Sequence, residues 1–204
     1  MPSVSLVRVG GLAAMLAGVL LVLGELVNLL VGFDTDPVEA ATSAISVFQS
    51  VLFMLGVALL LVGLVGLYTH LAEATSGLLG LVGFLLALVG TGMVMGVVWD
   101  QTFVVPALAR VAPAVLETQP PALVNFGFIF SFALFGLGWL LFGVGAYRAR
   151  LYPRIAVILL MVGAVLIILP LPFVGLIFAV GVAWLGLALL TGRNTSAEQP
   201  SRVR

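Results

Sequence analysis

Long blocks of apolar residues dominate this chain, and only short polar stretches separate them. The blocks cover residues 9–31, 44–68, 78–99, 123–147, 155–169 and 173–190. Crossing a bilayer as an α-helix takes about 20 mostly apolar residues. The pattern therefore predicts an all-α integral membrane protein, built as a bundle of six transmembrane helices. The first block exceeds the ~7–15 apolar residues of a signal-peptide core, so we expect it to be retained.

The last two blocks are separated by the short stretch Leu169-Pro170-Leu171-Pro172. Proline cannot donate to the helical hydrogen-bond ladder, so two prolines here mark a break. The alternative is one kinked segment over 155–190, which is much longer than a single crossing needs. A hairpin is therefore favoured. We expect a single transmembrane domain over 1–192, followed by a flexible cytoplasmic tail over 193–204.

The longest polar connection runs from residue 101 to residue 122. Apolar residues recur in it at helical spacing, at Val104, Leu108, Val111 and Val115. Pro106 could open a short helix and Pro113 would interrupt it. We expect an amphipathic segment on the outer membrane surface. An irregular loop is the alternative.

Composition supports the membrane assignment, because 63% of the residues are hydrophobic and only 8% are charged. A soluble domain carries about 25% charged residues. The net charge is zero, so nucleic acid is not an expected partner. The chain has no cysteine and a single histidine, so we expect no thiolate or multi-histidine metal site and no cofactor.

The arginines are distributed unevenly between the two predicted sides of the membrane. Seven fall on one side, at Arg8, Arg148, Arg150, Arg154, Arg193, Arg202 and Arg204. Arg110 is the only one on the other side. Positively charged residues are enriched in cytoplasmic loops. We therefore expect both termini in the cytoplasm and a multi-pass protein of the cytoplasmic (inner) membrane.

Small residues share helix faces, which allows membrane helices to approach closely. The predicted contact positions are Gly11, Ala14 and Gly18; Gly56 and Gly63; Gly92 and Gly96; and Gly127, Ser131, Gly138 and Gly145. They could be buried within one bundle or between protomers.

A few polar residues interrupt the apolar blocks and form the candidate site. Glu25 lies well inside the first block, where a charge is costly, so it should face protein or water or be protonated. We expect a polar vestibule in the outer half of the bilayer, formed by Glu25, Asn28, Gln49, Asp100 and Asn125, with Arg110 above them as a possible partner for Glu25 or Asp100. The alternative is that these residues sit at helix ends or make hydrogen bonds between helices.

An aromatic stripe runs along the fourth block. Its members are Phe128, Phe132, Phe135, Trp139 and Phe142. It could form a wall for a lipophilic ligand. Helix packing or lipid contact is the commoner cause of such a stripe.

The loop Tyr147-Arg148-Ala149-Arg150-Leu151-Tyr152-Pro153-Arg154 is followed by an apolar run that contains Gly163. It resembles a family of uncharacterised bacterial multi-pass membrane proteins, in which a penultimate loop reading Tyr-Arg-Ser-Gly-Tyr-Leu-Pro-Arg joins two late helices. Members of that family often have a histidine in the helix before this loop, whereas block 123–147 has none. The resemblance implies a polytopic helical fold and no known activity or functional residues.

Three classes of function follow. The first is a non-catalytic membrane component, either a subunit that binds another membrane protein or its own copy, or a binder of lipids or lipophilic small molecules. The second is a small proton-coupled transporter that uses Glu25, with Gly90-Thr91-Gly92 as the candidate helix break. An enzyme is the least favoured, because the sequence has no nucleophile elbow, metalloprotease helix or phosphate-binding loop.

Overall fold

The protein is helical throughout the part of the chain that the computed structural model describes. That part comprises residues 2–31, 36–74, 77–168 and 173–192, and it contains no strand. The α-helices are α1 (Pro2–Val31), α2 (Pro37–Thr42), α3 (Ala44–Ala74), α4 (Leu78–Trp99), α5 (Val105–Val111), α6 (Ala122–Ala149), α7 (Arg154–Leu166) and α8 (Val174–Thr191). A π-helix, η1, covers Asp100–Val104 and a 3-10 helix, η2, covers Pro113–Val115. The predicted all-α fold is confirmed.

Among the described residues, five helical segments are long and apolar enough to cross a membrane. They are Ser5–Asn28, Ala44–Ala74, Leu78–Val111, Ala122–Ala149 and Val174–Thr191. They indicate a membrane-embedded protein. The helix of the fifth predicted block, α7, has 13 residues, which at 1.5 Å per residue is about 20 Å long. The predicted break at residues 169–172 lies outside the described residues.

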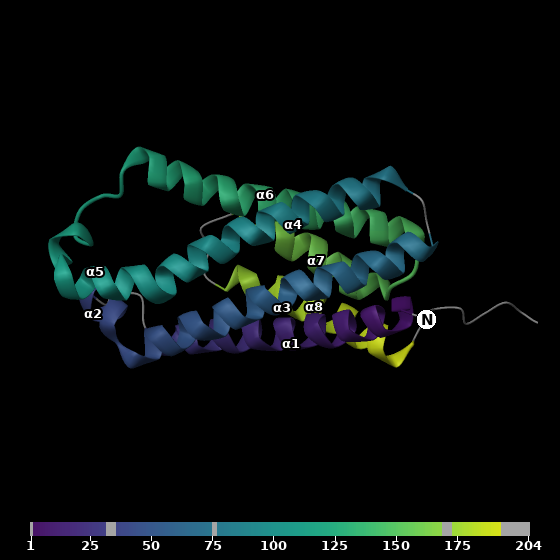
Figure 1. The fold of residues 1–204 in the computed structure, drawn as a ribbon, viewed down its shortest axis with the longest axis horizontal. Helices are drawn as coiled ribbons and strands as arrows, with labels where there is room; N and C mark the ends of the chain where they lie inside the picture. The colour runs from purple at the N-terminus through teal and green to yellow at the C-terminus, as the bar shows by residue number, and fades with distance from the viewer. Residues whose placement is uncertain (1, 32–35, 75–76, 169–172, 193–204) are drawn as a thin grey trace, which may run out of the picture.

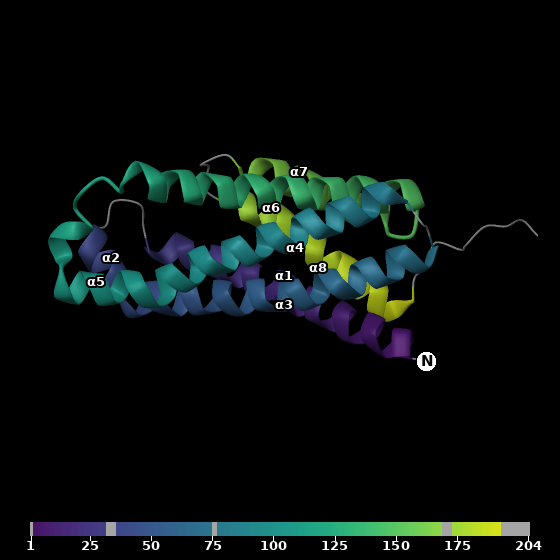
Figure 2. The ribbon, with the colours of Figure 1, turned by 45° about the horizontal axis from the view of Figure 1, so that its top comes forward.

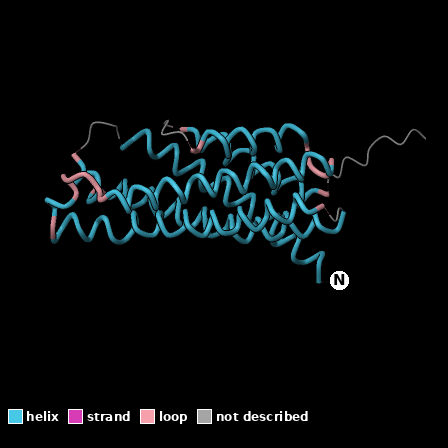
Figure 3. Tube along the Cα trace, turned by 90° about the horizontal axis from the view of Figure 1, so that it is seen from above, coloured by secondary structure: helices cyan, strands magenta, loops and turns pink. Residues whose placement is uncertain are grey.

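The long helices run along one common axis, with the connections gathered at the two ends (Figures 1 and 3). The beginning of α1, the end of α8 and the α6–α7 turn lie at one end of the bundle, and α2 and α5 lie at the other (Figure 1). Helix α1 packs most extensively on α3 and α8, and α4 packs on α6. The turned view of Figure 2 shows the same arrangement.

Small residues set the distance between the helices, as the sequence predicts. Added Cβ atoms at Gly11 and Gly18 would meet α8, and one at Gly63 would meet Ala14. A Cβ added at Gly56 would meet the side chain of Leu21. In this way α1 lies close to both of its neighbours, which helps to keep the core close-packed.

The predicted glycine pair of α4, Gly92 and Gly96, makes no contact within the described part of the bundle. Nothing lies within 4 Å of a Cβ added at Gly92 or Gly96, because the opposite face of α4 meets α6. There, Gly83 and Gly90 contact the backbone of α6. On α6, Gly138 and Gly145 contact α4 and Ser131 is buried, whereas Gly127 has open space beside it.

The segment after Trp99 continues α4 instead of forming a separate surface helix. The N–H of Val105 donates to the Asp100 carbonyl, five residues back, which makes η1 a π-turn. Pro106 follows at once, and a proline cannot donate in the ladder and crowds the preceding turn. A wider turn relieves that conflict. Helix α5 ends at Val111, before Pro113, as expected.

The four apolar residues that the sequence places on one face of this segment are exposed or half-buried. Val111 and Val115 are exposed, whereas Thr102 and Ala109 are buried. The transporter hypothesis placed a break at Gly90-Thr91-Gly92. Helix α4 is continuous there, and Gly90 and Thr91 are buried in the contact with α6.

The α6–α7 connection is held to the bundle by Tyr152. Its ring is buried, and its hydroxyl donates a 2.8 Å hydrogen bond to the Leu67 carbonyl of α3. Burial raises the pKa of Tyr152 above its ordinary value, so the hydroxyl stays protonated and able to donate. The His70 ring meets the Tyr152 ring edge-on, with 5.5 Å between the centroids. The loop that joins α6 to α7 is therefore fixed against the end of α3.

Candidate functional site

A partly open cavity of about 230 Å³ lies between the long helices. Residues of α1, α3, α4, α6 and α8 line it, together with Ile167 at the end of α7. Its apolar lining includes Phe53, Val57, Val94, Phe132, Phe135 and Phe178. The helices that pack closely through glycine residues elsewhere in the bundle therefore lie further apart around this cavity. The space is apolar on nearly every side.

Glu25 is the one ionisable residue among those that line the cavity. It comes four residues after Leu21, on the face of α1 that packs inward, so the helical repeat brings the carboxyl group into the bundle. Its Oε1 atom lies directly against the place that a Cβ of Gly175 would occupy. Glycine at position 175 therefore leaves room for the carboxyl group. Glu25 makes no hydrogen bond or ion pair with a described residue.

The carboxyl group also lies beside the first turn of α8. This helix begins at Val174, and the side chain at its N-cap position makes no capping hydrogen bond. The N-terminal end of a helix carries a partial positive charge that favours a nearby anion. Part of the cost of placing the Glu25 carboxylate inside the bundle is offset in this way.

The aromatic stripe of α6 divides into three parts. Phe132 and Phe135 line the cavity, Trp139 and Phe142 are fully buried in the core, and Phe128 is exposed. The Trp139 ring lies behind the lining, with its centroid 5.2 Å from that of Phe178. Its indole N–H donates a 3.0 Å hydrogen bond to the Thr91 hydroxyl of α4. The stripe thus serves both the cavity wall and the core.

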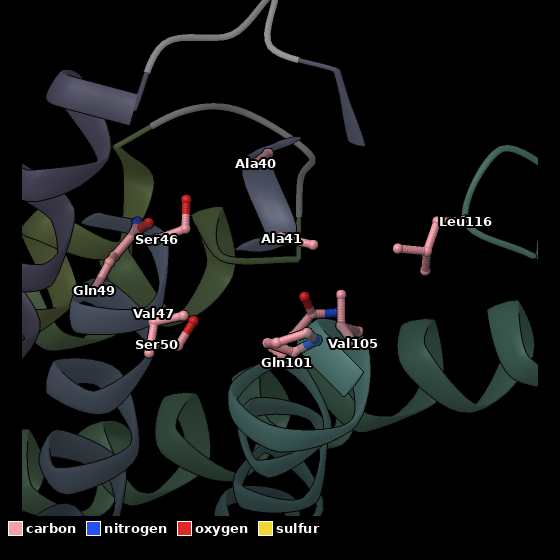
Figure 4. Close-up of a pocket in the computed structure, with 10 residues that line it drawn as sticks. Ala40, Ala41, Ser46, Val47, Gln49, Ser50, Gln101, Val105 and Leu116 are labelled. Carbon is pink, nitrogen blue, oxygen red and sulfur yellow. The ribbon is translucent and has the colours of Figure 1, made fainter. Parts of the chain in front are cut away.

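A second hollow, of about 340 Å³, lies at the end of the bundle that carries α2 and α5 (Figure 4). Ser46, Gln49 and Ser50 of α3 face it from one side, and Gln101 and Val105 face it from the other (Figure 4). This polar cleft has no ionisable side chain among the residues that line it. It can offer amide and hydroxyl groups to a solute.

The cleft and the cavity follow one another along the same two helices. On α3, Gln49 lines the cleft and Phe53 and Val57 line the cavity; on α4 and η1, Gln101 lines the cleft and Val98 lines the cavity. Eight residues separate Gln49 from Val57, which corresponds to about 12 Å along a helix. The two hollows are therefore neighbours along the bundle axis.

The remaining predicted site residues lie outside both hollows. Asn28 and Asp100 are half-buried, and Arg110 and Asn125 are exposed. No ion pair joins Arg110 to Glu25 or Asp100, all of which the structure describes. The structure thus places Glu25 in one hollow and Gln49 in the other, and it does not bring the predicted vestibule together as one cluster.

The reasoning from sequence missed most of the cavity lining, including Phe53, Gly175 and Phe178. Phe53 follows Gln49 by one helical turn, a spacing that could have placed it on the same face. Phe178 and Gly175 gave no signal, because their role depends on how α8 packs against α1. Among the described residues, no group of three His, Cys, Asp or Glu side chains could hold a metal ion.

Comparison with models of protein families, with curated proteins and with solved structures gives no match. The similarity of the loop at residues 147–154 to a bacterial membrane family therefore stays a resemblance. The functional case depends on the geometry of the bundle alone.

Proposed function

We propose that this protein binds a small lipophilic molecule inside its membrane-embedded bundle. The observation that carries the proposal is the cavity of about 230 Å³ at Glu25. Protein interiors are close-packed, and voids larger than a water molecule are few. Ligand pockets are mostly apolar with a small number of polar groups that orient the ligand. A cavity with several phenylalanine rings and one carboxyl group fits that description.

Filling the cavity tests this function. Val94 is buried and lines the cavity, whereas Val89 lies on the same helix and is 54% exposed. We expect Val94→Phe to occupy the binding space and Val89→Phe to leave it open. Native mass spectrometry of protein purified gently from its own host membrane should show a bound small molecule in the wild type and in Val89→Phe, and its loss in Val94→Phe.

Two results of that measurement would contradict the proposal. Equal retention of the small molecule by both variants would place it outside the cavity. A stoichiometric second protein, with no small molecule bound, would instead favour a subunit of a membrane complex.

We also propose a topology for this function. The chain crosses a bacterial inner membrane six times and has both termini in the cytoplasm. The arginine-rich α6–α7 turn and both ends of the described chain lie at the same end of the bundle, which supports it (Figure 1). The chain has no native cysteine, so a maleimide can label a single-cysteine variant only at the introduced cysteine. In intact cells a membrane-impermeant maleimide should label Val111→Cys and not Glu73→Cys. Labelling of Glu73→Cys alone would invert the topology.

A proton-coupled transporter is the second candidate function. The observation that favours it is the position of the polar cleft next to the cavity along α3 and α4, which places amide and hydroxyl groups between one end of the bundle and the cavity. Proteoliposomes loaded with a pH-sensitive dye would show solute-dependent proton uptake in the wild type and none in Glu25→Gln. Unchanged uptake in the variant would remove Glu25 from the transport mechanism.

A further inference from the structure

The chemistry of the cavity lining points to one class of ligand. We infer that the cavity takes a small lipophilic cation, whose charged head lies at Glu25 and whose apolar body lies among the phenylalanine rings. This inference rests on the proposed function, because it names the ligand class of the same cavity.

Charge is the first reason. Glu25 is the one ionisable side chain that lines the cavity, and no described basic residue pairs with it. Glu25 is half-buried, and a carboxylate beside apolar side chains is costly unless a positive charge or hydrogen-bond donors compensate it. The first turn of α8 compensates only in part, since it contributes partial charges. A cationic ligand would supply the positive charge that the described residues lack.

The aromatic lining is the second reason. Phe53, Phe132, Phe135 and Phe178 come from three different helices and face the same space as Glu25. The ring centroids of Phe135 and Phe178 lie 5.1 Å apart, with an interplanar angle of 59°. The faces of aromatic rings attract cations, and groups of aromatic rings are used to bind ammonium ligands. A neutral apolar ligand would use the rings and leave the carboxylate unpaired.

Cavity size limits the ligand. An apolar cavity of 150 Å³ takes one benzene molecule. By proportion, the 230 Å³ found here takes about nine heavy atoms. This is the size of an arylalkylamine such as 2-phenylethylamine, which is charged at neutral pH. 2-Phenylethanol has the same shape and size without the charge, so it is the matched neutral probe.

The test uses the three tryptophans of the chain. Trp139 is fully buried behind Phe135 and Phe178, whereas Trp99 and Trp184 are 52% and 39% exposed. The protein would be labelled with 5-fluorotryptophan, and the three resonances assigned with Trp99→Phe and Trp184→Phe. Each probe would then be titrated into the full-length protein in lipid nanodiscs. The two exposed tryptophans report non-specific partitioning of the probes into lipid.

We expect both probes to shift the Trp139 resonance saturably, with the amine binding about 10- to 100-fold more tightly, as a charge-assisted contact should. Glu25→Gln should remove that preference, mainly by weakening the binding of the amine. Gly175→Ala keeps the charge and displaces the carboxyl group, so it should weaken amine binding alone.

The possible failures are distinguishable. Equal affinities for the two probes in the wild type would overturn the inference of a cationic ligand and leave a lipophilic binding cavity. That comparison needs no variant, so it decides the question even where Glu25→Gln does not fold. If neither probe shifts Trp139 saturably, the proposed function fails, and the cation inference fails with it.

Discussion

Substituting Gly138 by alanine would test the close contact between α4 and α6. A Cβ at position 138 would lie 2.5 Å from the Cα of Ala87 and 2.5 Å from the carbonyl carbon of Leu86. These are backbone atoms, so a side-chain rotation cannot relieve the overlap. The two helices would have to separate along a contact in which Gly83 and Gly90 of α4 also meet the backbone of α6.

The size of the effect follows from two opposing terms. Overpacking a filled interior costs about 1–3 kcal/mol, and backbone obstruction places this site near the upper value. Alanine is favoured over glycine in a helix by up to about 1 kcal/mol. The net loss in unfolding free energy should be about 2 kcal/mol, which lowers the melting temperature of a protein of this length by about 4–8 °C.

Thermal unfolding in mild detergent, followed by tryptophan fluorescence, measures this loss. Gly92→Ala is the matched control, because it makes the same change on α4 at a position with nothing within 4 Å. The control should keep or slightly raise the melting temperature. Equal melting temperatures for Gly138→Ala and Gly92→Ala would refute the assigned helix contact.

Two further predictions concern buried hydrogen bonds and use the same unfolding measurement. Tyr152→Phe removes the hydroxyl that donates to Leu67 and should cost about 0.5–1.5 kcal/mol, whereas Tyr147→Phe, at an exposed ring, should cost nothing measurable. Equal losses in these two variants would contradict a role for the hydroxyl of Tyr152. Thr91→Val leaves the fully buried indole N–H of Trp139 without its acceptor and should cost about 1–3 kcal/mol of unfolding free energy. Thr91→Ser keeps the acceptor and should retain most of that stability. A Thr91→Val variant as stable as the wild type would be evidence against this hydrogen bond.

Within the candidate site, sequence reasoning singled out residues one at a time and did not place them relative to one another. Glu25 was recognisable because an acid inside an apolar block is unusual. Its neighbours were not, since Phe53, Phe178 and Gly175 are ordinary residues of apolar helices. Grouping Glu25 with Gln49 assumed that polar residues at similar depth share one space. Here the two side chains line different hollows along the bundle axis.

Local properties of the chain determined the helices and the membrane setting. The length of each apolar block and the positions of proline are features of consecutive residues, so they were readable without the fold. The small residues of α1 and α3 also predicted their contact faces, because the helical repeat alone places Ala14 and Gly63.

Only the tertiary structure decided which face of each remaining helix turns inward. Lipid is as apolar as the protein core, so an apolar pattern does not mark the buried side of a membrane helix. Helix α4 shows this directly, since it packs through Gly83 and Gly90 and leaves Gly92 and Gly96 exposed. The cavity has the same origin. It is lined by residues of five long helices, and at its edge Gly175 of α8 lies against Glu25 of α1, a contact between residues 150 positions apart that no local pattern encodes.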